Sequence, residues 1–110
     1  MGLRVGPTTG ALIMSVKTGT LDANSETFEM SVPFGAHGVC SVQISGTITV
    51  TWTMKVPGGS NAVPVYDQNG NAVAYTASDA FFAFGPGDYI ATATGVSGGS
   101  ALMEATTGKA

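Results

Sequence analysis

The sequence is poor in charge. Asp, Glu, Lys and Arg make up only 10% of its 110 residues, against about 25% in an ordinary soluble domain. Four cations, Arg4, Lys17, Lys55 and Lys109, stand against seven acids, and the net charge is −3. So few scattered cations cannot form the basic surface that holds nucleic acid, and we expect no nucleic-acid partner. A surface with so little charge is either covered by Ser, Thr, Asn and Gly or hidden against neighbouring proteins.

Cysteine and long apolar runs are scarce as well. Cys40 is the only cysteine, so no internal disulfide and no thiolate zinc site can form, which favours folding in a reducing cytoplasm. The longest apolar run covers residues 80–84, whereas about 20 apolar residues are needed for a helix to cross a bilayer. The first residues carry neither the apolar stretch of a signal peptide nor a myristoylation motif. We therefore expect no membrane partner.

Glycine and proline, by contrast, are plentiful and divide the chain into short segments. Sixteen glycines and five prolines recur about every 8–12 residues, which is the spacing of sandwiches and barrels. No window shows a sustained helical period, and a chain of this length has room for one domain. We predict an N-terminal arm over residues 1–10 and a single all-β domain over residues 11–110. Its fold is expected to be an antiparallel β-sandwich or jelly-roll-like domain of about eight short strands.

The clearest strand covers residues 47–56. Its apolar residues, Ile48, Val50, Trp52, Met54 and Val56, alternate with Thr and Lys, so one face of the strand is expected to enter a core. Shorter strands are predicted at residues 11–16, 26–32, 40–44, 63–66, 72–75, 81–84, 89–94 and 102–105. Turns are predicted at Gly46 and at residues 85–88 and 95–100. The predicted core consists of Phe28, Val42, Ile44, Val50, Trp52 and Met54.

The segment Asp67-Gln68-Asn69-Gly70-Asn71 allows two interpretations. Asn69-Gly70 predicts a two-residue hairpin turn with positive φ angles. The oxygen ligands at alternate positions also suggest a calcium loop, but Ala72 stands where such a loop needs glycine, and no Glu closes the site. We favour the hairpin and expect no metal.

Few side chains could perform chemistry. His37 is the only histidine and is predicted to be a solvated loop residue, without a nucleophile motif such as Gly-x-Ser-x-Gly. Cys40 is in phase with Val42 and is expected to pack in the core as a small apolar residue. Asp79 and Asp88 are too isolated to form the carboxylate pair of a glycosidase. We therefore predict no catalytic residue and no cofactor, and the chain is not expected to be an enzyme.

Two surface features suggest binding. The threonine row at 47, 49, 51 and 53 is interpreted first as an ordinary solvated strand face, second as a protein contact, and third as an ice-binding face. The third reading needs matching rows on adjacent strands, and no other segment is expected to supply one. Sugar stacking could use exposed aromatic residues, for which the candidates are Tyr66, Tyr75 and Tyr89.

The middle and end of the chain resemble a known group of proteins. The segment Ser41-Val42-Gln43-Ile44-Ser45-Gly46-Thr47 leads into the long alternating strand, and Gly87-Asp88-Tyr89-Ile90 comes near the end. This order, over about residues 20–107, resembles small β-sandwich virion proteins of tailed bacteriophages: decoration, head-fibre and head- or tail-attached modules. In that group a V-Q-[IV]-S-G-T strand opens the sandwich and a G-x-Y-[IV] strand lies near its end. The present chain has Ala91 where the group commonly has Arg after the Tyr-hydrophobic pair.

The resemblance implies a non-enzymatic virion structural protein that packs onto a capsid, neck or tail surface, as a decoration, cement or adaptor subunit. Its partners would be other virion proteins or copies of itself, and it would be made in the host cytoplasm and located in the virion. The alternative is a carbohydrate- or receptor-binding β-sandwich module. We expect assembly contacts in the arm, in the last strand and along edge strands, at Leu3, Arg4, Val5, Leu102 and Met103.

Overall fold

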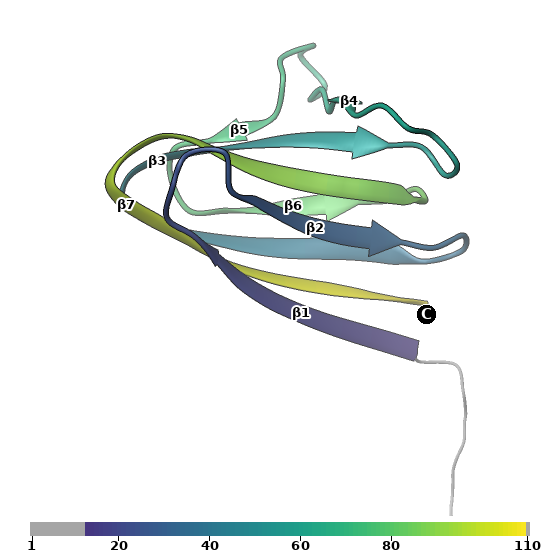
Figure 1. Cartoon of the computed structure of the whole chain (residues 1–110). Helices are drawn as coiled ribbons and strands as arrows, with labels where there is room; N and C mark the ends of the chain where they lie inside the picture. Colours follow the sequence, from purple (N-terminus) through teal and green to yellow (C-terminus); the bar gives the residue numbers. More distant parts are fainter. Residues whose placement is uncertain (1–12, 110) are drawn as a thin grey trace, which may run out of the picture.

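The computed structural model describes residues 13–109, and all their regular structure is β (Figure 1). The strands are β1 (Ile13–Leu21), β2 (Thr27–Val32), β3 (His37–Lys55), β4 (Val63–Pro64), β5 (Ala74–Tyr75), β6 (Asp79–Ala83) and β7 (Gly87–Lys109). Every pair of neighbouring strands is antiparallel. The predicted all-β antiparallel sandwich is confirmed. Residues 13–109 include no helix that is long and apolar enough to cross a membrane.

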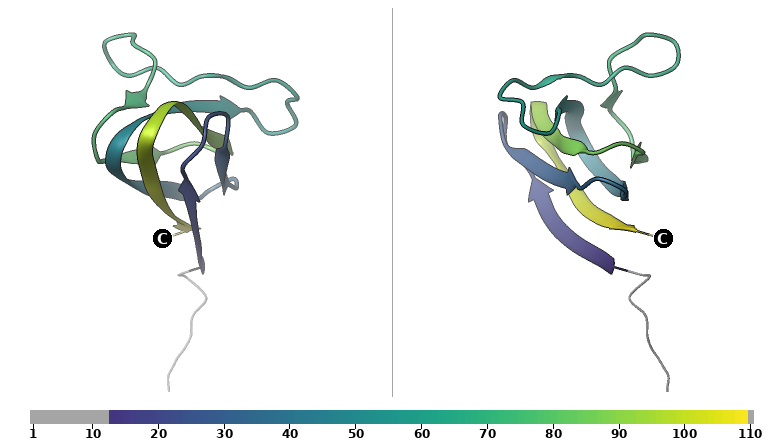
Figure 2. Two further views of the ribbon diagram at one scale, coloured as in Figure 1. Left: turned by 60° about the vertical axis from the view of Figure 1, so that its left-hand side comes forward. Right: turned by 90° about the vertical axis from the view of Figure 1, so that its right-hand side faces the viewer.

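Two long strands organise the fold. β3 and β7 pair with each other from His37↔Gly108 to Lys55↔Asp88, and both bend in the middle, so that each passes from one layer to the other (Figures 1 and 2). The first layer contains β1, residues 100–109 of β7, residues 37–45 of β3, and β6. The second layer contains β2, residues 87–98 of β7, residues 47–55 of β3, and the short strands β4 and β5.

Glycines form the bend. The register of β3 on β7 shifts between Ser45 and Thr49, where Gly46 has φ +75° and Gly98 has φ +68°. A Cβ on Gly46 would lie 2.6 Å from the Gly98 carbonyl oxygen, so the two backbones approach this closely only because the side chain is absent. The predicted turns at Gly46 and residues 95–100 are therefore wrong. These glycines bend two continuous strands, and seven strands result where about eight were expected.

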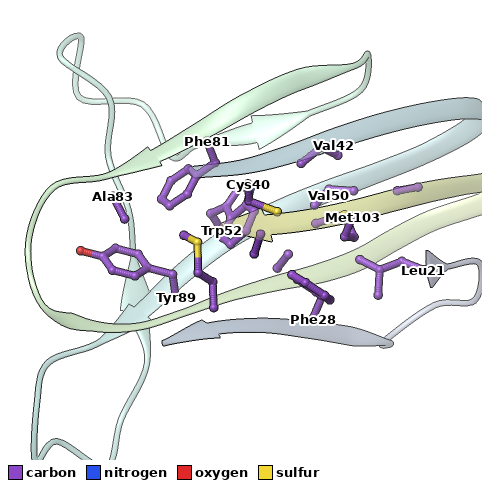
Figure 3. Packing of buried hydrophobic residues seen from close by; sticks show 14 of the residues in the cluster. Leu21, Phe28, Cys40, Val42, Val50, Trp52, Phe81, Ala83, Tyr89 and Met103 are labelled. Atoms are coloured by element: carbon purple, nitrogen blue, oxygen red, sulfur yellow. The ribbon is translucent and has the colours of Figure 1, made fainter. Parts of the chain in front are cut away.

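The core lies between the two layers, as Figure 3 shows. The Trp52 ring is fully buried, and it stacks on Phe81 with ring centroids 4.2 Å apart and planes 8° from parallel. Trp52 belongs to the second layer and Phe81 to the first, so this stack joins the two layers. Small residues such as Ala91 and Ala93 are also fully buried, and they leave room for the larger rings.

The predicted core is confirmed at its centre and differs at its margin. Phe28, Val42, Val50 and Trp52 are buried, whereas Ile44 and Met54 are partly buried and pack against the cluster from outside. Val56, which was expected on the core face, is exposed because β3 ends at Lys55. Strand β1 continues to Leu21, five residues beyond its predicted end at Val16.

The Asp67 segment is a hairpin, but not of the expected kind. Gly70 has φ +82° and Asn69 has no positive φ, and the Gly70 N–H donates to the Asp67 carbonyl at 3.0 Å. The prediction of a two-residue turn with positive φ at both residues is therefore wrong. The loop has three residues and is closed by a left-handed glycine, which is the next most common hairpin connection.

Candidate interaction surface

The outer face of the first layer carries a row across four strands in which three of the four side chains are apolar. Val16 of β1 pairs with Thr106 of β7, Thr106 pairs with Val39 of β3, and Val39 pairs with Phe82 of β6. Residues that pair directly have side chains on the same face of a sheet. Their chain neighbours Cys40 and Phe81 are buried in the core. The row therefore points away from the core, towards solvent.

Further apolar side chains extend this row. Met14 lies two residues before Val16 on β1, and Phe84 follows β6 directly. The rings of Phe82 and Phe84 are nearly parallel, with centroids 6.3 Å apart, and His37 meets Phe84 edge-on at 6.1 Å. We call the set Met14, Val16, Val39, Phe82 and Phe84 the outer apolar face.

The outer apolar face is large for an unpartnered surface. Met14 is 58% exposed, Val16 62%, Phe82 59% and Phe84 75%. Because a buried aromatic side chain covers about 150–250 Å², the two Phe rings alone leave roughly 200–300 Å² of apolar area in contact with water. With Met14 and Val16 the patch reaches the size of about 300–600 Å² at which the largest patch of a monomer is often functional.

A hollow with both polar and apolar lining adjoins the outer apolar face on the same layer. It has a volume of about 430 Å³ and is lined by Thr18, Gly19, Thr20, Ser41, Gln43, Leu102, Met103 and Glu104. Glu104 is the only titratable residue in this lining, so the hollow has no acid–base pair. Hydroxyl, amide and carboxylate groups can bind a polar segment of a partner, and the hollow resembles the polar rim that surrounds an apolar contact.

The outer face of the second layer differs, because it presents threonine. Thr51 of β3 pairs with Thr92 of β7, which pairs with Thr27 of β2, and Thr49 pairs with Thr94. The expectation that no adjacent strand supplies a matching threonine row is therefore wrong. Threonine is typical of a pleated face that meets water. The two exteriors of the sandwich thus differ in chemistry: one is rich in threonine, and the other combines the outer apolar face with the polar residues around the hollow.

The residues singled out for chemistry, His37, Cys40, Asp79 and Asp88, do not meet at one exposed site. His37 is exposed, as expected, but it is the first residue of β3 and not part of a loop. Cys40 is fully buried, which confirms its core position, and burial raises the pKa of its thiol to about 11. Asp88 accepts a hydrogen bond from the Ser31 hydroxyl at 2.8 Å, and Asp79 binds the N–H of Ala80.

Carboxylates in two loops hold backbone N–H groups. Asp67 Oδ1 accepts from the N–H groups of Asn69 and Asn71 at 2.9 and 3.0 Å. Glu26 Oε1 accepts from two N–H groups of the β1–β2 loop, and these bonds lower the pKa of Glu26. No group of three His, Cys, Asp or Glu residues within the described part of the chain could hold a metal ion. The carboxylates therefore stabilise turns.

The three tyrosines do not form a platform for sugar. Tyr66 is exposed, whereas Tyr89 is buried and donates its hydroxyl to the Gly85 carbonyl at 2.8 Å. Tyr75 is half-buried and donates to the Ala80 carbonyl. Burial raises the pKa of Tyr75 to about 12, and the nearby Asp79 charge adds to this shift. The exposed aromatic pair of the molecule is Phe82 and Phe84.

Of the five predicted assembly contacts, two lie within the described residues. Leu102 is exposed in the lining of the hollow and can reach a partner. Met103 is 2% exposed and belongs to the core, so its side chain cannot meet a partner while the domain is folded. The two differ because adjacent residues of a strand point to opposite faces. Leu3, Arg4 and Val5 lie outside the described residues.

The apolar face itself was not anticipated from the sequence. One signal was present: Phe81, Phe82 and Phe84 crowd one short strand, and continuous apolar residues in a strand indicate that both of its faces are covered. Only the fold places Met14, Val16 and Val39 beside them. Comparison with known proteins adds no family: no family model matches the sequence, and no curated protein matches it significantly.

Proposed function

We propose that this protein is a non-enzymatic structural subunit of a tailed-bacteriophage virion, which attaches to a capsid, neck or tail surface through the outer apolar face. The observation that carries the proposal is the row of apolar side chains on β1, β3 and β6, which leaves Val16 and Phe82 more than half exposed. Covering such a face releases water from apolar surface and favours association.

Three further observations support an attachment role. The low charge content, 10% of residues, suits a surface that is partly hidden in an assembly. The outer apolar face lies on one exterior of the sandwich, which gives that exterior an area suited to a protein partner. The one nucleophilic thiol, Cys40, is fully buried, and the candidate carboxylates accept hydrogen bonds from neighbouring residues. The resemblance to phage β-sandwich modules points to a virion as the larger object.

The first test is whether the chain is part of purified virions, which mass spectrometry of the particles decides. The second test is a variant of the face, Phe82→Asp. Phe82 points outward and is exposed, so the domain should fold with an unchanged circular dichroism spectrum. A buried carboxylate at the contact is strongly unfavourable, and we expect incorporation into particles to fall at least tenfold.

Thr94→Asp provides the matched control. It introduces the same charge at an exposed position on the other exterior of the sandwich, and we expect incorporation at the wild-type level. Absence of the chain from purified virions would refute the virion proposal. Normal incorporation of Phe82→Asp would show that the outer apolar face is not the attachment surface.

A second candidate function is recognition of a carbohydrate or receptor. It is favoured by the exposed, nearly parallel rings of Phe82 and Phe84, since exposed aromatic rings can stack on a sugar. Under this alternative, host-surface polysaccharide should bind the purified chain, and Phe84→Ala should abolish that binding. The attachment proposal expects no such binding.

A further inference from the structure

We infer that two copies of this chain associate through β1, whose outer edges pair antiparallel about a two-fold axis to form one continuous sheet. The inference names a second copy as one partner of the proposed structural protein, and it rests on that proposal. The edge of β1 carries it, and the outer apolar face adds independent support.

The edge of β1 is long and regular. β1 pairs with β7 over nine consecutive positions, from Ile13↔Lys109 to Leu21↔Ala101, without a bulge. Within the described chain, β7 is the only strand that pairs with β1. The opposite edge of β1 therefore presents unpaired backbone N–H and C=O groups along its length, which is the arrangement that another strand can join.

Lys17 is the only residue of β1 of a kind that shields an edge. Proteins usually shield an edge with proline, a bulge, or charged side chains that point outward or inward, and β1 contains no proline, no bulge and no acidic residue. Its one charged residue, Lys17, turns towards β2: the ammonium donates to the Glu29 carbonyl at 2.8 Å and lies 5.0 Å from the centroid of the Phe28 ring. The cation therefore occupies the interior side of the strand.

The other edges are shielded or short. β2 carries Glu29 and is followed by Pro33. β4 and β5 have two residues each, and β6 has five and begins at Asp79. In addition, every residue from Met14 to Thr18 is exposed, so both faces of the first half of β1 are open.

A second copy fits this edge better than an unrelated strand does. Two identical edges cover each other at once, and a symmetric dimer is the commonest oligomer of soluble proteins. With the axis near Val16, Lys17 of one copy faces Ser15 of the other, so no like charges oppose each other. The apolar row then continues through Val16 into the row of the second copy, which doubles the attachment surface.

A cysteine scan of the full-length chain tests the inference. We would replace Ser15, Val16, Lys17 and Thr18 singly by cysteine and treat each variant with a mild oxidant. Directly opposed residues of paired strands have Cβ atoms about 4.5–5.5 Å apart, close enough for a disulfide. The native Cys40 is fully buried and should not react. We expect disulfide-linked dimers to peak at one or two adjacent positions.

Phe82→Cys is the matched control. Phe82 lies on the same face and is about as exposed as Val16, 59% against 62%, but it belongs to the opposite edge of the layer. Its dimer yield should be at least tenfold lower than at the best β1 position. Dimers at Phe82→Cys but not on β1 would show that the copies meet by their faces, and dimers at no position would show a monomer. Either result overturns the inference.

A second comparison separates this inference from the proposed function. Val16→Lys places a charge at the β1 edge and should convert the dimer to a monomer in sedimentation experiments, whereas Phe82→Asp should remain a dimer. If the β1 cysteines crosslink while Phe82→Asp enters particles normally, the dimer stands and the attachment surface is wrong. If Phe82→Asp is excluded from particles while the β1 cysteines do not crosslink, the attachment surface stands and the dimer is wrong.

Discussion

At the scale of the residue, the fold depends on a few large side chains set among small ones. Trp52 is the largest fully buried side chain, and its ring is held between the layers by the stack on Phe81. Phe81 in turn contacts the ring of Tyr89 at 5.6 Å between centroids. The next residue, Phe82, points outward and is more than half exposed. Of these two neighbouring phenylalanines, Phe81 thus stabilises the core and Phe82 forms part of the outer surface.

Replacing Trp52 by alanine should therefore strongly reduce the stability of the fold. Trp52→Ala removes the ring and leaves a cavity between the layers, and we expect the free energy of unfolding to fall by about 3–5 kcal/mol. Since a domain of this kind is stable by only about 5–15 kcal/mol, much of the soluble protein should be lost. Denaturant titration measures the change. Phe82→Ala is the control, with an expected loss below about 1 kcal/mol, and a comparable loss for both variants would contradict the strand phase.

Because of the buried Cys40 thiol, the free energy of unfolding is expected to depend on pH in the alkaline range. Burial raises the pKa of its thiol from an ordinary 9.0 to about 11, so between these values the folded state holds a proton that the unfolded state has released. Stability must therefore fall as the pH rises through this range. We expect a loss of roughly 1 kcal/mol between pH 9 and pH 10.

Cys40→Ala isolates this contribution. Tyr75 also has a raised pKa, of about 12, but its effect begins mainly above pH 10. In denaturant titrations the alanine variant should lose most of the dependence between pH 9 and pH 10. If the wild type and Cys40→Ala show the same slope, the thiol is not the source.

At the scale of the element, the decisive feature is the bend shared by β3 and β7. A straight pair of such long strands would leave one face of a wide sheet bare. By bending at Gly46 and at residues 95–99, the pair supplies strands to both layers and buries its inner face against itself. Bulges and glycines of this kind are the usual means of curving a sheet.

Adjacent glycines of the bend should respond differently to alanine. A Cβ on Gly99 would overlap the backbone of Thr47, whereas a Cβ on Gly98 would meet nothing within 4 Å. We expect Gly99→Ala to lose at least about 3 kcal/mol or to fail to fold, because backbone atoms cannot yield. Gly98→Ala should lose only about 1–2 kcal/mol, the cost of its φ of +68°.

Thermal and denaturant unfolding of the two variants give the comparison. The pair is closely matched, since both positions are glycine and they are consecutive in β7. Equal destabilisation would mean that conformational strain, and not the close approach of β3 to β7, sets the need for glycine at the bend.

At the scale of the whole molecule, the sandwich presents two unlike exteriors and, within the described residues, one long unpaired edge. The threonine face suits water, the outer apolar face suits a protein partner, and the edge of β1 suits a second copy. All three arise from the same sheet, because each strand of the first layer contributes one side chain in two to the core and the other to the outside. The proposed assembly role uses the outer face of the first layer, whose side chains point away from the core.

Truncation separates folding from assembly. Deleting residues 2–10 leaves all seven strands, since β1 begins at Ile13, and we expect an unchanged circular dichroism spectrum and melting temperature. We also expect the truncated chain to be lost from particles, because the predicted contacts Leu3, Arg4 and Val5 are removed. Incorporation at wild-type occupancy would show that the arm plays no part in assembly.

The sequence by itself determined the class of the fold and much of the core. Strict alternation in residues 47–54 placed Val50 and Trp52 inside, and the phase of Cys40 and Val42 did the same for the first half of β3. Period two requires only a strand with one covered face, and this is a local property. The Asn-Gly pair likewise located the hairpin, although the number of loop residues also depends on the Asp67 side chain.

Only the tertiary structure decided how the strands continue and what the surface shows. Glycine at positions 46, 95, 98 and 99 suits a turn and a bend equally well. The choice depends on the approach of Gly98 to Gly46 from a distant part of the chain. The outer apolar face depends in the same way on register. Val16, Val39 and Phe82 are far apart in sequence, and the pairing of four strands brings them into one row.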